Sequence, residues 1–171
     1  ERWSLAAPVL TSECRTLDSD TAVSVASLVT EDAGMVSVTS FTVLRRDGGV
    51  VLSNLGVSGA QLSHLGRTTE VVVTHELASL PPNLIVLAFG TNEGFSPILD
   101  LDLYEAELRH QVFRFRWLAG RDVPILLLGP PDAATRTPNG PAASCGAGWL
   151  VPQRLAEVRE RQRAVAGELG L

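Results

Sequence analysis

The 171-residue sequence contains no lysine, only two cysteines and no long hydrophobic run. Its formal charge is −5 with a pI near 5.2, which argues against a surface that binds nucleic acid or an anionic membrane. No apolar stretch approaches the roughly 20 residues that a membrane-spanning helix needs. An initiator methionine and a signal peptide are also lacking. We therefore expect that the sequence starts inside a longer protein or has been processed.

The two cysteines, Cys14 and Cys145, are far apart in the sequence. They are compatible either with one long-loop disulfide in an oxidising compartment or with two free thiols, and the sequence leaves both open. Neither has a partner at metal-ligand spacing, and the three histidines are scattered. We therefore expect no metal site. Hydrophobic residues make up 45% of the chain, which is sufficient for a packed core.

The chain divides by pattern near residue 54. Alternating small polar and apolar residues at 21–30 and 35–44, a turn at 45–49 and a restart at 50–52 predict short antiparallel strands over residues 20–53. After residue 54, helices and strands alternate. We therefore predict two parts, a β-rich segment at 1–53 and an α/β segment at 54–171.

The second part has the pattern of a parallel sheet with flanking helices. Buried strands are predicted at 83–90 and 124–129, and each is followed by an amphipathic helix, at 101–118 and 155–169. In the first of these helices the period places Arg114 on the outward face. Shorter helices are predicted at 58–65 and 68–80. Such a pattern is typical of a flavodoxin-like α/β fold with both faces of the sheet covered. Ligands bind beyond the carboxyl ends of such strands, which places residues 90–93 and 129–132 on one rim.

Two segments have features of a site that stabilises negative charge as it forms on a substrate oxygen. The first, residues 54–60 (NLGVSGA), is a glycine-containing turn before a helix, where unpaired backbone N–H groups are available to an anion. The second, residues 90–93 (GTNE), places Asn92 directly after a buried strand, where its amide can donate a hydrogen bond to an ester oxyanion. Taken alone, each segment is better explained as an ordinary turn or a helix cap.

Taken together, these segments resemble two of the four blocks of the SGNH (GDSL-like) hydrolase family. Residues 90–93 resemble its Gly-x-Asn block, and residues 54–60 resemble its glycine block, with Gly59 supplying the backbone N–H. Residues 126–132 (LLLGPPD) and the later Gly148-Trp149 resemble the branch that includes bacterial O-acetyl-peptidoglycan esterases. In that branch a β-rich, carbohydrate-binding-module-like insertion precedes the glycine block, and the predicted strands at 20–53 resemble its tail.

The resemblance implies a serine esterase that removes an acetyl group from a polysaccharide or peptidoglycan. It also implies that Gly59 and Asn92 form part of the oxyanion hole, that no cofactor is needed, and that the protein lies outside the cytoplasm. Glu93 is a further candidate for contact with an acylated carbohydrate substrate, and a solvated carboxylate at the rim explains it equally well. Phe95 and Asp132 lie near the same rim. The alternative is a carbohydrate-binding or scaffolding protein that keeps the fold without the chemistry.

The family's Gly-Asp-Ser and Asp-x-x-His blocks are missing from the sequence. Ser19, in Leu17-Asp18-Ser19-Asp20, lacks the preceding glycine. His64, His75 and His110 fall within predicted helices and are better explained as surface or partly buried helix residues. A serine hydroxyl without a base is a weak nucleophile. We therefore expect little or no turnover from these 171 residues alone.

Overall fold

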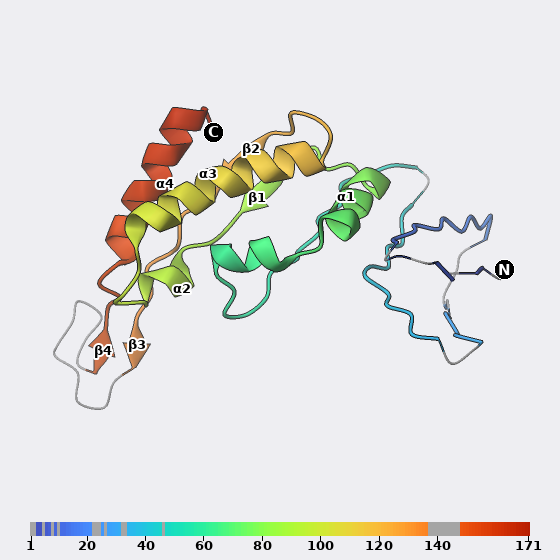
Figure 1. Ribbon diagram of the computed structural model, residues 1–171, viewed down its shortest axis with the longest axis horizontal. Coiled ribbons are helices and arrows are strands. Elements are labelled where there is room, and N and C mark those ends of the chain that lie inside the picture. The colour runs from blue at the N-terminus through green and yellow to red at the C-terminus, as the bar shows by residue number, and fades with distance from the viewer. Residues whose placement is uncertain are drawn as a thin grey trace.

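The structure, a computed structural model, describes residues 3–4, 6–7, 9, 11–21, 25, 27–31, 34–45, 47–136 and 148–171. Cys145, several residues of the predicted strand at 21–30 and most of the loop at 132–148 lie outside the described residues. The helices and strands of the described residues lie between Leu62 and Leu169 (Figure 1).

The core of the fold is a two-stranded parallel sheet. Strands β1 (Ile85–Leu87) and β2 (Ile125–Leu127) pair in register, with Val86 opposite Leu126. Parallel strands need a long crossover connection, and the 18-residue helix α3 (Leu101–Leu118) supplies it. The parallel α/β arrangement predicted for this part of the chain is therefore confirmed for the two strands.

Helices α3 and α4 (Leu155–Leu169) pack against each other and against one face of this sheet (Figure 1). Leu87 and Ile125 meet Val112 of α3 in one core cluster, and Val158 and Val165 of α4 pack in a second. The predicted bounds of both helices agree with the observed ones. Asp100 begins α3 by accepting hydrogen bonds from the backbone N–H groups of the first turn, as an N-cap carboxylate does.

The other face of the two strands is not covered by any element of the described residues, which differs from the prediction of strands buried on both faces. Val86 and Leu126 are each about half exposed, and Leu84 and Leu128 are exposed beside them. A continuous apolar run predicts that a strand can be buried on both sides. It does not guarantee that a second layer of helices is present.

Short elements complete the α/β part. They are the 3₁₀ helix η1 (Leu62–Arg67), the helices α1 (Glu70–Ser79) and α2 (Thr91–Gly94), and the antiparallel pair β3 (Thr135–Arg136) and β4 (Trp149–Leu150). The short helix predicted at 58–65 is a 3₁₀ helix and begins four residues later, at Leu62. The helix predicted at 68–80 is confirmed as α1.

The β-rich unit predicted for residues 20–53 is not seen: no described residue before Leu62 belongs to a helix or strand. The alternating segment 35–44 is exposed, and Met35 and Val43 are among its most exposed side chains. Alternation supplies one apolar face, but a strand also needs a neighbouring strand to pair its backbone and a layer to cover that face. Neither is present for this segment among the described residues. The division of the chain at residue 54 stays a prediction.

Candidate oxyanion site

The carboxyl ends of β1 and β2 lie at one edge of the sheet, as the parallel pairing requires. β1 leads through Phe89 to Gly90 and α2, and β2 leads to Gly129 and Pro130. The two ends lie close together: a Cβ atom added to Gly90 would be only 3.1 Å from Cγ of Pro130. This agrees with the predicted common rim for residues 90–93 and 129–132.

Gly90 occupies a position that other residues cannot take. Its φ is +116°, which L side chains rarely adopt. A Cβ there would also meet Val158 Cγ1 at 2.9 Å and Gln162 Nε2 at 3.0 Å. The backbone can therefore turn from β1 into α2 directly beneath α4, and this turn sets the direction of the next residues, Thr91 and Asn92.

The glycine block forms a tight turn. The backbone N–H of Ala60 donates to the carbonyl of Val57 at 3.0 Å, and Gly59 within this turn has a φ of +78°. A positive φ at the third position is the requirement of a type II turn, which explains a glycine there. No atom lies within 4 Å of a Cβ built on Gly59, so the requirement is conformational rather than steric.

Asn92 links the two predicted blocks. Its Nδ2 donates a hydrogen bond to the backbone carbonyl of Ala60 at 2.7 Å, across 32 residues of sequence. Ala60 follows Gly59 directly, so the two candidate donors lie close together at the rim. The Asn92 side chain is exposed. Because an amide nitrogen carries two hydrogens, Asn92 retains a second N–H beyond the one that bonds Ala60.

Glu93 occupies a structural position beneath this contact. Its side chain is only 3% exposed, and its two oxygens accept backbone N–H groups of Leu62 at 2.6 Å and of Gly90 at 3.0 Å. This burial and pairing do not support the predicted contact between Glu93 and substrate. The sequence suggested a rim carboxylate, whereas a Glu at the third position of a helix commonly turns back to bond the N-cap N–H.

The sequence signals missed a polar cluster under the rim. Gln162 Nε2 donates to the carbonyl of Phe89 at 2.8 Å and contacts the Tyr104 hydroxyl at 2.8 Å. Burial raises the pKa of the Tyr104 phenol well above its ordinary value. The hydrogen bond with Gln162 partly offsets this rise in pKa, whereas the nearby Glu93 carboxylate adds to it. The phenol is therefore neutral at physiological pH. The only sequence signal for this cluster is that Gln162 occupies the apolar face of α4.

Arg114 is another residue whose environment differs from the one that the sequence predicts. The helical period predicts that it points outward from α3, yet it is buried and donates to the backbone carbonyls of Leu65 and Thr68. These bonds hold the junction between η1 and α1 against α3. The glycine block precedes η1 directly, so Arg114 contributes to its placement.

The other sequence candidates do not form a catalytic pair. The Ser19 hydroxyl is exposed and bonds Thr21, and His64 accepts the backbone N–H of Gln61 with Nδ1. His75 and His110 are exposed on their helices. No hydrogen bond joins a serine hydroxyl to a histidine ring among the described residues. Within the same part of the chain, no group of three or more His, Cys, Asp and Glu side chains is placed to hold a metal ion.

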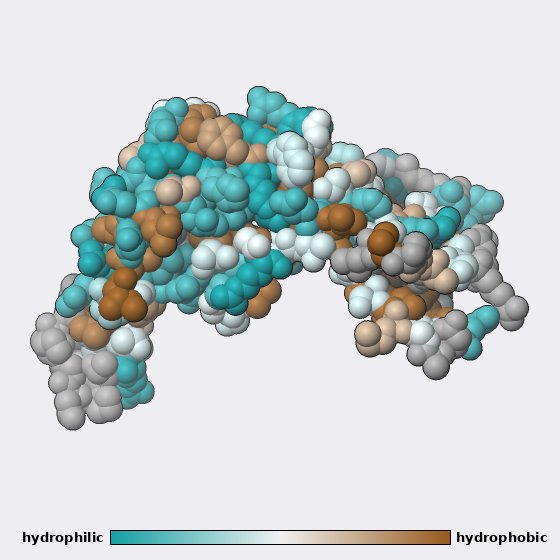
Figure 2. All heavy atoms as spheres, in the orientation of Figure 1, coloured by the Kyte–Doolittle hydropathy of each residue, from teal (hydrophilic) through white to brown (hydrophobic). Residues whose placement is uncertain are grey.

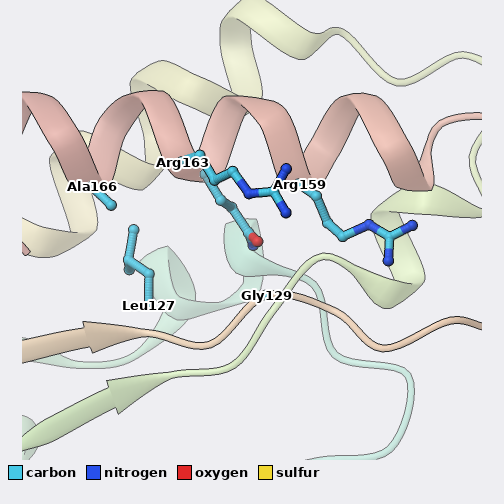
Figure 3. Close-up of a pocket in the computed structure, with 6 residues that line it drawn as sticks. Leu127, Gly129, Arg159, Arg163 and Ala166 are labelled. Carbon is cyan, nitrogen blue, oxygen red and sulfur yellow. The ribbon is translucent and has the colours of Figure 1, made fainter.

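Two hollows lie near the rim. One, of about 260 Å³, lies between β2 and α4; Figure 3 shows Arg159 and Arg163 extending along α4 above Gly129. The buried Gln162 Oε1 beside it has no hydrogen-bond partner among the described residues. The other, of about 290 Å³, lies beside α2 and the β3–β4 pair. Asp132, near the first hollow, accepts a hydrogen bond from the Arg159 guanidinium at 2.8 Å.

A solved structure of a peptidoglycan O-acetylesterase is similar to this chain, with 28% sequence identity and a TM-score of 0.56. The similar region covers 68% of this chain and 31% of that one, so the chain spans about a third of the length of the esterase. No protein-family model matches the sequence, and neither does any curated protein. None of the helices in the described ranges is both long and apolar enough to cross a membrane.

Proposed function

We propose that this chain is the oxyanion-hole part of an SGNH-type carboxylic ester hydrolase that deacetylates a polysaccharide or peptidoglycan. The observation that carries the proposal is the hydrogen bond from Asn92 to Ala60, which joins the glycine turn to the Gly-Thr-Asn-Glu turn at the carboxyl edge of a parallel sheet. The similarity to a peptidoglycan O-acetylesterase supports the same class of reaction. Such a substrate lies outside the cytoplasm, which agrees with the predicted location.

The proposed reaction is acyl transfer through a serine. The serine oxygen attacks the ester carbonyl while a histidine takes the hydroxyl proton, and the carbonyl oxygen becomes an oxyanion. The Gly59 N–H and the second N–H of Asn92 donate to that oxyanion. As the tetrahedral intermediate collapses, the C–O bond to the sugar breaks and the histidine gives its proton to the leaving oxygen, which releases the sugar hydroxyl. Water, deprotonated by the same histidine, then hydrolyses the acetyl-serine to acetate and regenerates the serine. In this proposal the serine and the histidine–aspartate pair are supplied by residues outside this 171-residue chain.

The experiment compares the natural gene product with the 171-residue chain. Each is treated with a fluorophosphonate, which phosphonylates an activated serine, and its intact mass is measured; acetate release from O-acetylated peptidoglycan is followed in parallel. One added phosphonyl group and acetate release by the natural gene product alone support the proposal. An unlabelled natural gene product that releases no acetate overturns it.

A second candidate function is carbohydrate binding without catalysis. The observation that favours it is the lack of any serine–histidine hydrogen bond among the described residues. In that case the natural gene product retains O-acetylated saccharide and leaves the acetyl groups in place. Equilibrium binding measured alongside acetate release therefore separates the two functions.

A further inference from the structure

The second hollow, which we call the Phe95 pocket, opens beside the candidate oxyanion site. It has a volume of about 290 Å³. Three separate parts of the fold form its walls: the end of α2 with the turn after it, the β3–β4 pair, and the segment that leads into α4. Its main lining residues are Phe95, Pro97, Thr135, Leu150, Gln153 and Arg154. In Figure 2, hydrophobic and hydrophilic side chains are both visible near the end of the molecule where β3 and β4 lie, and the face over α3 and α4 is largely hydrophilic.

The walls of the pocket combine apolar surface with hydrogen-bonding groups. Phe95 and Leu150 are each about two-fifths exposed, although both are large apolar side chains. Thr135, Gln153 and Arg154 add a hydroxyl, an amide and a guanidinium to the residues of the lining, and the Arg154 guanidinium also donates to Glu157 at 3.0 Å. A pyranose ring presents apolar C–H faces and hydroxyl groups around its rim. The C–H faces of the sugar therefore suit packing against the Phe95 ring, and its hydroxyls suit hydrogen bonds with the polar lining residues.

The pocket lies one helical turn from the proposed oxyanion donor. Asn92 lies on α2 and turns toward Ala60, whereas Gly94 and Phe95 at the end of the same turn line the pocket. Three residues of helix advance about 4.5 Å. Neighbouring units of one saccharide chain are therefore able to occupy both places at once. The buried Glu93 holds the α2 turn through its hydrogen bonds with Leu62 and Gly90, and this turn sets the separation between the two places.

We propose that the Phe95 pocket is a saccharide subsite that binds a pyranose unit next to the unit that carries the ester. This inference rests on the proposed function for the choice of an acylated polysaccharide as substrate. The binding itself requires only residues that this chain contains. The subsite is therefore testable without the catalytic serine.

The experiment titrates the 171-residue chain with a trimer of β-1,4-linked N-acetylglucosamine and measures the dissociation constant by calorimetry. We expect saturable binding that Phe95→Ala weakens about tenfold, because the ring face supplies the main apolar contact. The matched control is Phe113→Ala, since Phe113 is also an exposed phenylalanine but lies on α3, away from the pocket. That control is expected to leave the dissociation constant within about twofold.

Three outcomes overturn the subsite: no binding by the unaltered chain, equal binding by Phe95→Ala, or an equal loss in Phe113→Ala. If circular dichroism shows that Phe95→Ala is unfolded, the exposed Gln153→Ala variant decides the question by the same loss of affinity. Acetate release reports separately on the proposed function. If the trimer binds but the natural gene product releases no acetate, the subsite is supported and the esterase proposal is overturned. If the natural gene product releases acetate but Phe95→Ala binds the trimer as well as the unaltered chain does, the esterase is supported and the subsite is overturned.

Discussion

The carboxylate of Glu93 accepts the backbone N–H of Leu62 at 2.6 Å, although 31 residues separate them in the sequence. The other oxygen of the same carboxylate accepts the N–H of Gly90 at 3.0 Å. One buried side chain therefore ties the start of η1, which follows the glycine turn, to the start of α2, which carries Asn92. The relative position of the two candidate oxyanion donors depends on this carboxylate.

Replacing Glu93 with Gln is expected to destabilise the fold. The amide has one acceptor oxygen where the carboxylate has two, so one buried N–H group loses its partner and a buried hydrogen bond to a charged group is lost. The free energy of unfolding should fall by about 1.5–3 kcal/mol, measured by urea denaturation. The control is Glu160→Gln, because Glu160 is an exposed residue of α4. Equal denaturation midpoints for the two variants would contradict the role given to Glu93.

Replacing Asn92 with Ala is expected to separate catalysis from stability. In the natural gene product the rate of acetate release should fall about a hundredfold or more, because one donor to the oxyanion is lost. The exposed bond to Ala60 is also lost, at a cost of only about 0.5–1.5 kcal/mol in unfolding free energy. Asn83→Ala is the control, since Asn83 is exposed and precedes the opposite end of β1. An unchanged rate of acetate release in Asn92→Ala would show that Asn92 is not part of the oxyanion hole.

The sequence predicted the elements that depend on a local period. Helices at 101–118 and 155–169 follow from apolar residues every three or four positions, and the parallel strands follow from short apolar runs on either side of a long helix. Residues 20–53 carry an equally clear alternation and form no strand among their described members. The difference is that a helix satisfies its own backbone, whereas a strand depends on a partner elsewhere.

The sequence located the rim but not the roles of all its residues. The strand pattern placed residues 90–93 and 129–132 on one rim, and the family resemblance paired Gly59 with Asn92. The hydrogen bond between Asn92 and Ala60 shows that the two turns meet. Glu93 and Arg114 were misjudged because charged residues are usually exposed. Each is buried because it bonds backbone groups of a distant segment. Such pairing is decided by tertiary contacts, which no local pattern contains.

Replacing Gly90 with Ala is expected to destabilise the α/β core through two separate effects. The positive φ alone costs an alanine about 1–2 kcal/mol. The added Cβ must also displace Val158 and Gln162, which lie 2.9 and 3.0 Å from its position. Gly120→Ala is the matched control, because Gly120 has a φ of +63° and no neighbour within 4 Å of its Cβ. Thermal unfolding should show a clearly larger loss for Gly90→Ala, and equal losses would mean that the crowding is unimportant.

Acid is expected to weaken the packing of α3 against α4 through Glu105. Hydrogen bonds from Arg161 and then Arg109, at 2.6 and 2.5 Å, hold the pKa of the Glu105 carboxyl below its ordinary value. Because the folded-state pKa is depressed, the stabilisation is complete above the ordinary value of 4.5 and is lost as the pH falls below it through the folded-state pKa. Arg161 belongs to α4 and Glu105 to α3, so this ion pair joins the two helices that cover the sheet.

The pH dependence is measured as the urea midpoint between about pH 6 and about pH 3, for the unaltered chain and for Glu105→Gln. The variant cannot ionise at this position, so its midpoint should fall less steeply below about pH 4.5. Glu160→Gln is again the control, because the exposed Glu160 pairs with Arg163 of the same helix, α4. Because the Glu105 pairs are partly exposed, added salt should reduce the difference between the unaltered chain and Glu105→Gln. Parallel pH profiles for all three proteins would show that the Glu105 pairs contribute nothing to the α3–α4 contact.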